Sequence, residues 1–162
     1  MKRAISILSI YLLFLATMPS FATSGAHFFN DTSASVDLST GGLIIHIDEG
    51  GVGQARVNYD YSIAASATYQ CFNGGGNHPK AENKATFSST TTGTASFNPT
   101  NGRVQQTLTV SGTPLSTNGF SCPGGQTLYL VSVSYSVVLT DTTNGVTAPT
   151  LTAGADKLFI QV

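Results

Sequence analysis

Charged side chains are scarce in this sequence. Lys, Arg, Asp and Glu make up 9% of its 162 residues, whereas about 25% is typical of soluble domains. The few basic residues form no patch and no polybasic stretch, so nucleic acid and an anionic membrane surface are not expected as partners. Ser, Thr, Asn and Gly supply the polarity instead. This composition favours strands joined by tight turns.

Tryptophan is absent, and with it the flat ring that most often stacks on sugars. We expect the tyrosines of the alternating segments to lie in the core, where they cannot replace it. These are Tyr59, Tyr61, Tyr69 and Tyr135.

Recognisable catalytic motifs are also missing. The stretch from Gly119 to Pro123 lacks the second glycine of a nucleophile elbow, and its Ser121 adjoins a cysteine. No pair of acidic residues is placed as a glycosidase requires, and no phosphate-binding glycine loop lies between a strand and a helix. An enzyme is therefore the least expected class, and we expect no cofactor.

The one long apolar run lies at the N-terminus. Lys2 and Arg3 precede an apolar segment from Ile5 to Ala16, and small residues follow up to Ala22. This pattern predicts a secretory signal peptide over residues 1–22, too short for a membrane anchor. No later segment is apolar enough to span a membrane. The mature part, residues 23–162, keeps five basic and eight acidic residues, a net charge of −3, and its length suits a single domain.

The sequence contains two cysteines, Cys71 and Cys122. In an exported chain an even number predicts a disulfide. It would close a loop of roughly 50 residues, worth about 4 kcal/mol in the chain-entropy model. A catalytic thiol is the alternative, but no Cys/His pair supports it.

Alternation of apolar and polar residues indicates the strands. It is clearest from Val57 to Cys71, a length that predicts a bend or bulge near residues 64–66. In a second segment, Leu128–Thr140, five apolar residues from Val131 to Leu139 are expected on one face. Further strands are expected at Ala34–Leu38, Leu43–Asp48, Ala85–Ser89, Thr94–Phe97, Arg103–Val110 and Leu158–Val162.

The segment around Thr90, Thr91 and Thr92 is interpreted as a hairpin tip. Seven or eight short strands with glycine-rich turns predict an all-β fold. The expected architecture is a two-sheet sandwich of immunoglobulin-like type. A jelly roll or a small barrel is the alternative.

A candidate binding site follows from the cysteines, because the bridge would bring two glycine-rich segments to the same end of the sandwich. Consecutive glycines allow close approach of a ligand to the backbone, and the flanking side chains offer donors and acceptors for a sugar, a carboxylate or a peptide end. The alternative is that the glycines only satisfy turn geometry and that the polar groups are solvated. The candidate residues are Asn73, Gly74, Gly75, Gly76, Asn77, His78, Lys80 and Gln126.

His46 and Asp48 are candidate metal ligands, because they share a face of one expected strand and lie beside Glu49. A metal needs three or four ligands. The other histidines, His27 and His78, are distant in sequence. No metal is therefore expected.

Two segments together resemble a known group of proteins. They are ATYQCFNGGGNHPKA at residues 67–81 and FSCPGGQ at residues 120–126, the latter with the strand that ends at Gly145. They resemble small secreted bacterial proteins with no known activity, over roughly Val57 to Gly145. The resemblance implies export and a bridged β-domain, and it implies no activity.

These observations favour a secreted, extracellular or periplasmic binding module whose partner is a small ligand, a glycan or a protein. The alternative is a structural or adhesive subunit that pairs strands with its neighbours, as pilin-like proteins do. The C-terminal strand Leu158–Val162 is the expected edge or exchanged strand in that case. An oligomer is therefore possible.

Overall fold

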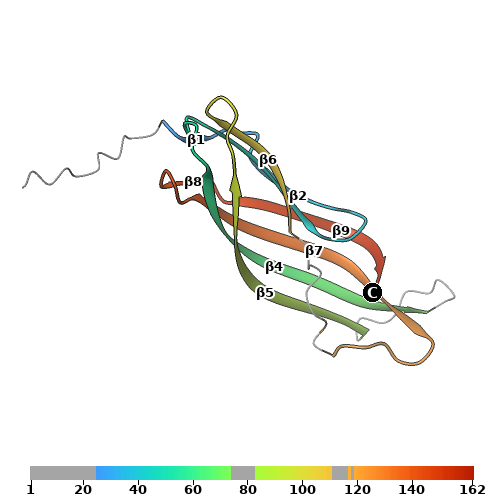
Figure 1. Ribbon diagram of the computed structural model, residues 1–162. Helices are drawn as coiled ribbons and strands as arrows, with labels where there is room; N and C mark the ends of the chain where they lie inside the picture. Colours follow the sequence, from blue (N-terminus) through green and yellow to red (C-terminus); the bar gives the residue numbers. More distant parts are fainter. Residues whose placement is uncertain (1–24, 74–82, 111–116, 118) are drawn as a thin grey trace, which may run out of the picture.

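The computed structural model describes residues 25–73, 83–110, 117 and 119–162. This part of the chain is built of strands in two antiparallel sheets that pack against each other (Figure 1). The expected signal peptide, residues 1–22, lies outside the described residues. No helix in the described part of the chain is long and apolar enough to cross a lipid bilayer.

The smaller sheet is organised around its central strand. Its strands are β1 (His27–Phe28), β2 (Ser33–Val36), β3 (Leu43–Gly50) and β6 (Arg103–Val110). β1 and β2 pair with opposite ends of one edge of β3, and β6 pairs along the whole of its other edge.

The larger sheet has two long central strands. Its members are β4 (Val57–Asn73), β5 (Lys84–Phe97), β7 (Gln126–Asp141), β8 (Val146–Thr147) and β9 (Leu151–Gln161). The order across the sheet is β5–β4–β7, with β8 and β9 pairing on the far edge of β7. β4 has 17 residues and β7 has 16, whereas β3 and β6 have eight each. The larger sheet therefore extends beyond the smaller one.

The core lies between the sheets and follows the predicted alternation. Along β4 the odd-numbered positions Val57, Tyr59 and Tyr69 are fully buried, and Ile63 and Ala67 are nearly so. They pack against inward residues of β3 and β7. The expectation for the tyrosines is confirmed for Tyr59, Tyr69 and Tyr135, while Tyr61 is only partly buried, its ring lying against Gly93.

The predicted hairpin tip at Thr90–Thr92 is wrong. β5 runs unbroken from Lys84 to Phe97 and pairs with β4 along its length. Its middle, Ser88–Thr92, is exposed at every position. A strand that is solvated on both faces has no apolar alternation, so its sequence looks like a loop.

The register shows no bulge at residues 64–66 of β4, where one was expected, and the inserted residue lies in the neighbouring strand β7. The pairing of β4 with β7 shifts between Thr68 and Tyr69, whose partners are Ser132 and Leu130. Val131 is therefore the extra residue. One inserted residue reverses the side-chain phase of the rest of the strand, so Leu130 takes the core position and Val131 does not lie on the face predicted for it.

The predicted disulfide is present. Cys71 and Cys122 are bonded, with their Cα atoms 5.6 Å apart, and Cys71 is fully buried. The bond ties the end of β4 to the segment that precedes β7. In that segment the ring of Phe120 lies 6.3 Å from that of Phe87 and packs on the core. The bridged segment therefore covers an end of the larger sheet that the short strands of the smaller sheet do not reach.

Candidate functional site at the disulfide end

Two of the predicted site residues come together at this end of the sandwich. Asn73 and Gln126 are the last pair of the ladder between β4 and β7. The side chain of Asn83 adds a third group, because its Nδ2 donates to Oε1 of Gln126 over 3.0 Å. The predicted residues Gly74, Gly75, Gly76, Asn77, His78 and Lys80 lie outside the described residues.

An aromatic cluster that was not predicted lies at the same end of the larger sheet, on the face opposite to that of Asn73 and Gln126. It consists of Phe72 of β4, Tyr129 of β7 and Phe159 of β9. The ring centre of Phe72 lies 5.6 Å from that of Tyr129 and 5.6 Å from that of Phe159. Phe159 is 63% exposed. We call these three residues the aromatic cluster.

The sequence held one signal for this cluster. Phe72 lies on the even phase of β4, whose members point away from the core, and a large apolar residue there is unusual. The sequence suggested the wrong face for Tyr129. If the alternation of β7 were unbroken, Tyr129 would point into the core together with Val133 and Tyr135. The bulge at Val131 moves it to the outer face, where it pairs with Gln70.

A shallow hollow of about 270 Å³ lies beside the cluster. Its lining combines aromatic rings with two ammonium groups, one carboxylate, an amide and a hydroxyl. It is lined by Gln70, Phe72, Lys84, Val131, Ser132, Asp156, Lys157 and Phe159. Such a mixture can hold the apolar face of a ligand against a ring while hydrogen bonds fix its hydroxyl or amide groups.

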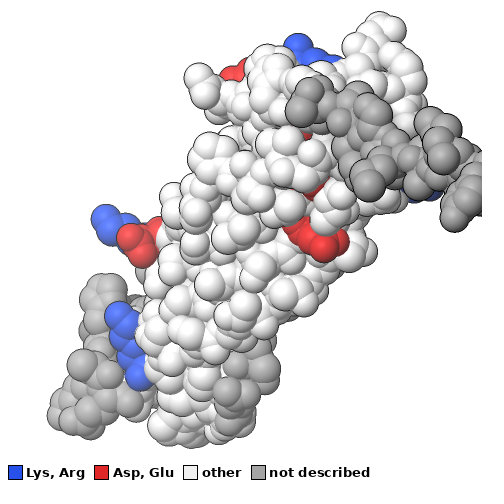
Figure 2. Space-filling model, turned by 90° about the vertical axis from the view of Figure 1, so that its left-hand side faces the viewer, with Lys and Arg blue, Asp and Glu red and all other residues white. Residues whose placement is uncertain are grey.

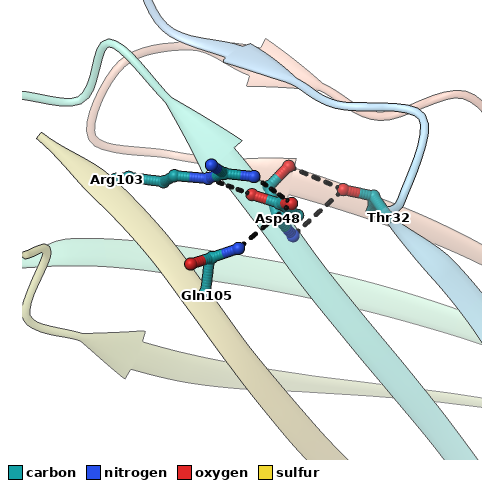
Figure 3. Close-up of polar contacts among 4 residues, drawn as sticks. All are labelled: Thr32, Asp48, Arg103 and Gln105. Atoms are coloured by element: carbon teal, nitrogen blue, oxygen red, sulfur yellow. Dashed lines mark hydrogen bonds and ion pairs between the residues drawn. The ribbon is translucent and has the colours of Figure 1, made fainter.

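Asp48 forms a separate polar cluster on the smaller sheet (Figure 3). Arg103 donates to both of its carboxylate oxygens, over 2.7 and 2.6 Å. The hydroxyl of Thr32 accepts from the backbone N–H of Asp48 over 3.1 Å and donates to its carbonyl over 2.8 Å. The guanidinium also lies 4.6 Å from the ring centre of Phe29.

These contacts give the Asp48 cluster a structural role. Hydrogen bonds from Arg103 hold the pKa of Asp48 below its usual value, against the effect of burial. Its carboxylate is 1% exposed and already bound in a bidentate pair. Within the described residues, no three His, Cys, Asp or Glu side chains are grouped to hold a metal ion. His46 instead contacts the Thr107 hydroxyl at 3.4 Å.

A third polar cluster is buried at the opposite end of the sandwich. The hydroxyl of Tyr59 donates to Oε2 of Glu49 over 2.7 Å, and both residues are fully buried together with Asp141. Burial, together with the neighbouring Asp141 carboxyl, raises the pKa of Glu49 to about 7, against the hydrogen bond from Tyr59, which lowers it. Asp141 accepts backbone N–H groups of Thr143 and Asn144 and so closes the turn after β7. None of these carboxyl groups is exposed to a substrate.

The disulfide end is thus the place where exposed aromatic and polar groups converge. Comparison with protein-family models, with curated proteins and with solved structures finds no match for this chain. The resemblance of its two loops to small secreted bacterial proteins stays a prediction from the sequence.

Proposed function

We propose that this protein is a secreted or cell-surface, non-enzymatic binding module that holds a glycan at its disulfide end. The observation that carries the proposal is the aromatic cluster of Phe72, Tyr129 and Phe159 beside the hollow that Gln70, Lys84 and Asp156 help to line. A sugar ring has an apolar C–H face and a rim of hydroxyl groups. An exposed ring flanked by the polar groups of this hollow offers a matching surface to both.

Several features support this class over an enzyme. The buried carboxyl groups of Asp48, Glu49 and Asp141 take part in hydrogen bonds within the fold. The disulfide suits an oxidising compartment, in line with the expected signal peptide. The pairing order, with three strand positions in one sheet and four in the other, favours an immunoglobulin-like sandwich.

The proposal is tested by glycan-array binding of the wild type and of Phe159→Ala. Because Phe159 is the most exposed ring of the cluster, the variant should bind its glycans at least tenfold more weakly while keeping the wild-type melting temperature. Val138→Ala is the matched control: Val138 is 45% exposed on the same sheet and lines a different hollow, beside Tyr61 and Thr92.

Equal loss in both variants, or no glycan bound by the wild type, would contradict the proposal. A peptide library screened with the same two variants would then test the alternative ligand. If peptide binding is lost in Phe159→Ala but not in Val138→Ala, the binding site stays as proposed and its ligand is a peptide instead of a glycan.

A structural subunit that assembles by strand pairing is the second candidate. The C-terminal strand expected to serve it is an edge strand, β9, but it is already paired with β7 from Tyr129 to Val137. The specific observation in favour of assembly lies at the other edge of the same sheet.

A further inference from the structure

The edge of β5 differs from the other sheet edges. Among the described strands β5 pairs with β4 alone. Over 13 residues, from Ala85 to Phe97, it has no charged residue and no proline. Long uncharged edge strands are templates for pairing with another chain, and proteins usually protect them with charge, bulges or cover.

The other edges carry such protection. β9 has a bulge where Lys157 adopts a φ of 61°, next to the charged Asp156. β2 packs alongside β9. β6 is only eight residues long and begins at Arg103, whose side chain is 42% exposed. Within the described part of the chain, such protection is therefore lacking at β5 and present at the other sheet edges.

The middle of β5 is also open on both faces. Ser89 and Thr91 are in the phase of β5 that points toward the smaller sheet, yet both are exposed. Charged side chains are few on the face shown in Figure 2, and residues 85–97 of β5 contribute none to any face. A second strand could approach this edge without displacing packed side chains and without separating ion pairs.

We propose that β5 pairs antiparallel with β5 of a second copy of this chain, with Thr91 on the two-fold axis. In this register each large residue faces a small one: Phe87 lies opposite Ala95 of the second copy, and Phe97 opposite Ala85. On the outer face, hydroxyl residues oppose hydroxyl residues, as Thr90 does Thr92. The match in size and the absence of like charges fit a copy of the same strand.

This pairing joins the two larger sheets into one continuous sheet. It does not depend on glycan binding, because β5 from Ser88 onward contributes no residue to the aromatic cluster or its hollow. The two ideas can therefore fail separately.

The pairing can be tested by replacing Thr91, the residue on the two-fold axis, with a charged residue and measuring the oligomeric state by sedimentation equilibrium at low salt. Wild-type protein should behave as a dimer. Thr91→Lys and Thr91→Glu each place like charges directly opposite each other, so each alone should be a monomer at the same concentration, and both should keep the wild-type circular dichroism. An equimolar mixture should regain the dimer, since Lys then faces Glu. A monomeric wild type, or dimeric single variants, would overturn the proposal.

Disulfide trapping tests the register. Under mild oxidation Thr91→Cys should form a covalent dimer, because residue 91 faces itself across the axis. Thr152→Cys, exposed on β9, is the control and should stay monomeric. Equal trapping of both variants, or none at residue 91, would contradict the register.

Discussion

Glu49 is the most unusual side chain of the core. It continues the inward phase of Ile45 and Ile47 on β3, where an apolar residue would be expected. One of its oxygens accepts from Tyr59, and the other, Oε1, is buried and has no hydrogen-bond partner among the described residues. A protonated carboxyl group removes the cost of burying a charge there. This explains why its pKa rises to about 7.

This raised pKa predicts how stability depends on pH. Because the folded-state pKa of about 7 exceeds the ordinary value of 4.5, the folded protein holds a proton that the unfolded chain releases. The contribution is fully present below pH 4.5 and is lost as pH rises through 7. It amounts to at most about 3 kcal/mol. Urea unfolding between pH 5 and 8 should show this loss for the wild type.

Glu49→Gln is the matched variant, because it keeps an acceptor for Tyr59 but cannot ionise. The difference in unfolding free energy between variant and wild type should grow in favour of the variant from pH 5 to pH 8. Titration of other groups cancels in this difference. A difference that stays constant with pH would show that Glu49 does not titrate in this range.

At the scale of elements, the disulfide secures the end of the larger sheet that carries the candidate site. Replacing Cys71 and Cys122 together by Ala should lower the free energy of unfolding by about 3–4 kcal/mol. Hydrogen exchange gives the more specific check. Amides of β4 and β7 near Phe72 and Gln126 should exchange faster, while those of β3 keep their relative protection. Uniform acceleration throughout would contradict a local role for the bridge.

The elements also show where sequence reasoning succeeds. Alternation predicted β4, β6 and β7 because each buries one face, so its period follows from packing. It failed for β5, whose middle is exposed on both faces, and it underestimated β9, which begins at Leu151. Val131 was assigned to the wrong face because no residue in the sequence marks the bulge there.

At the scale of the whole molecule, the all-β class and the disulfide were predictable because each depends on composition and short-range pattern. The candidate site could be predicted only in part. The pairing of Asn73 with Gln126 followed from the bridge. The aromatic cluster did not, because it unites three strands whose neighbourhood depends on the sheet order and on one inserted residue.

The account depends most on the disulfide end being the surface that binds. The direct measurement is a titration of isotope-labelled protein with an oligosaccharide selected on the array, followed by amide chemical shifts. The account predicts that the shifts gather at Gln70, Phe72, Tyr129 and Phe159 and leave Val138 unchanged. Shifts that gather around Val138, with none at the aromatic cluster, would contradict it.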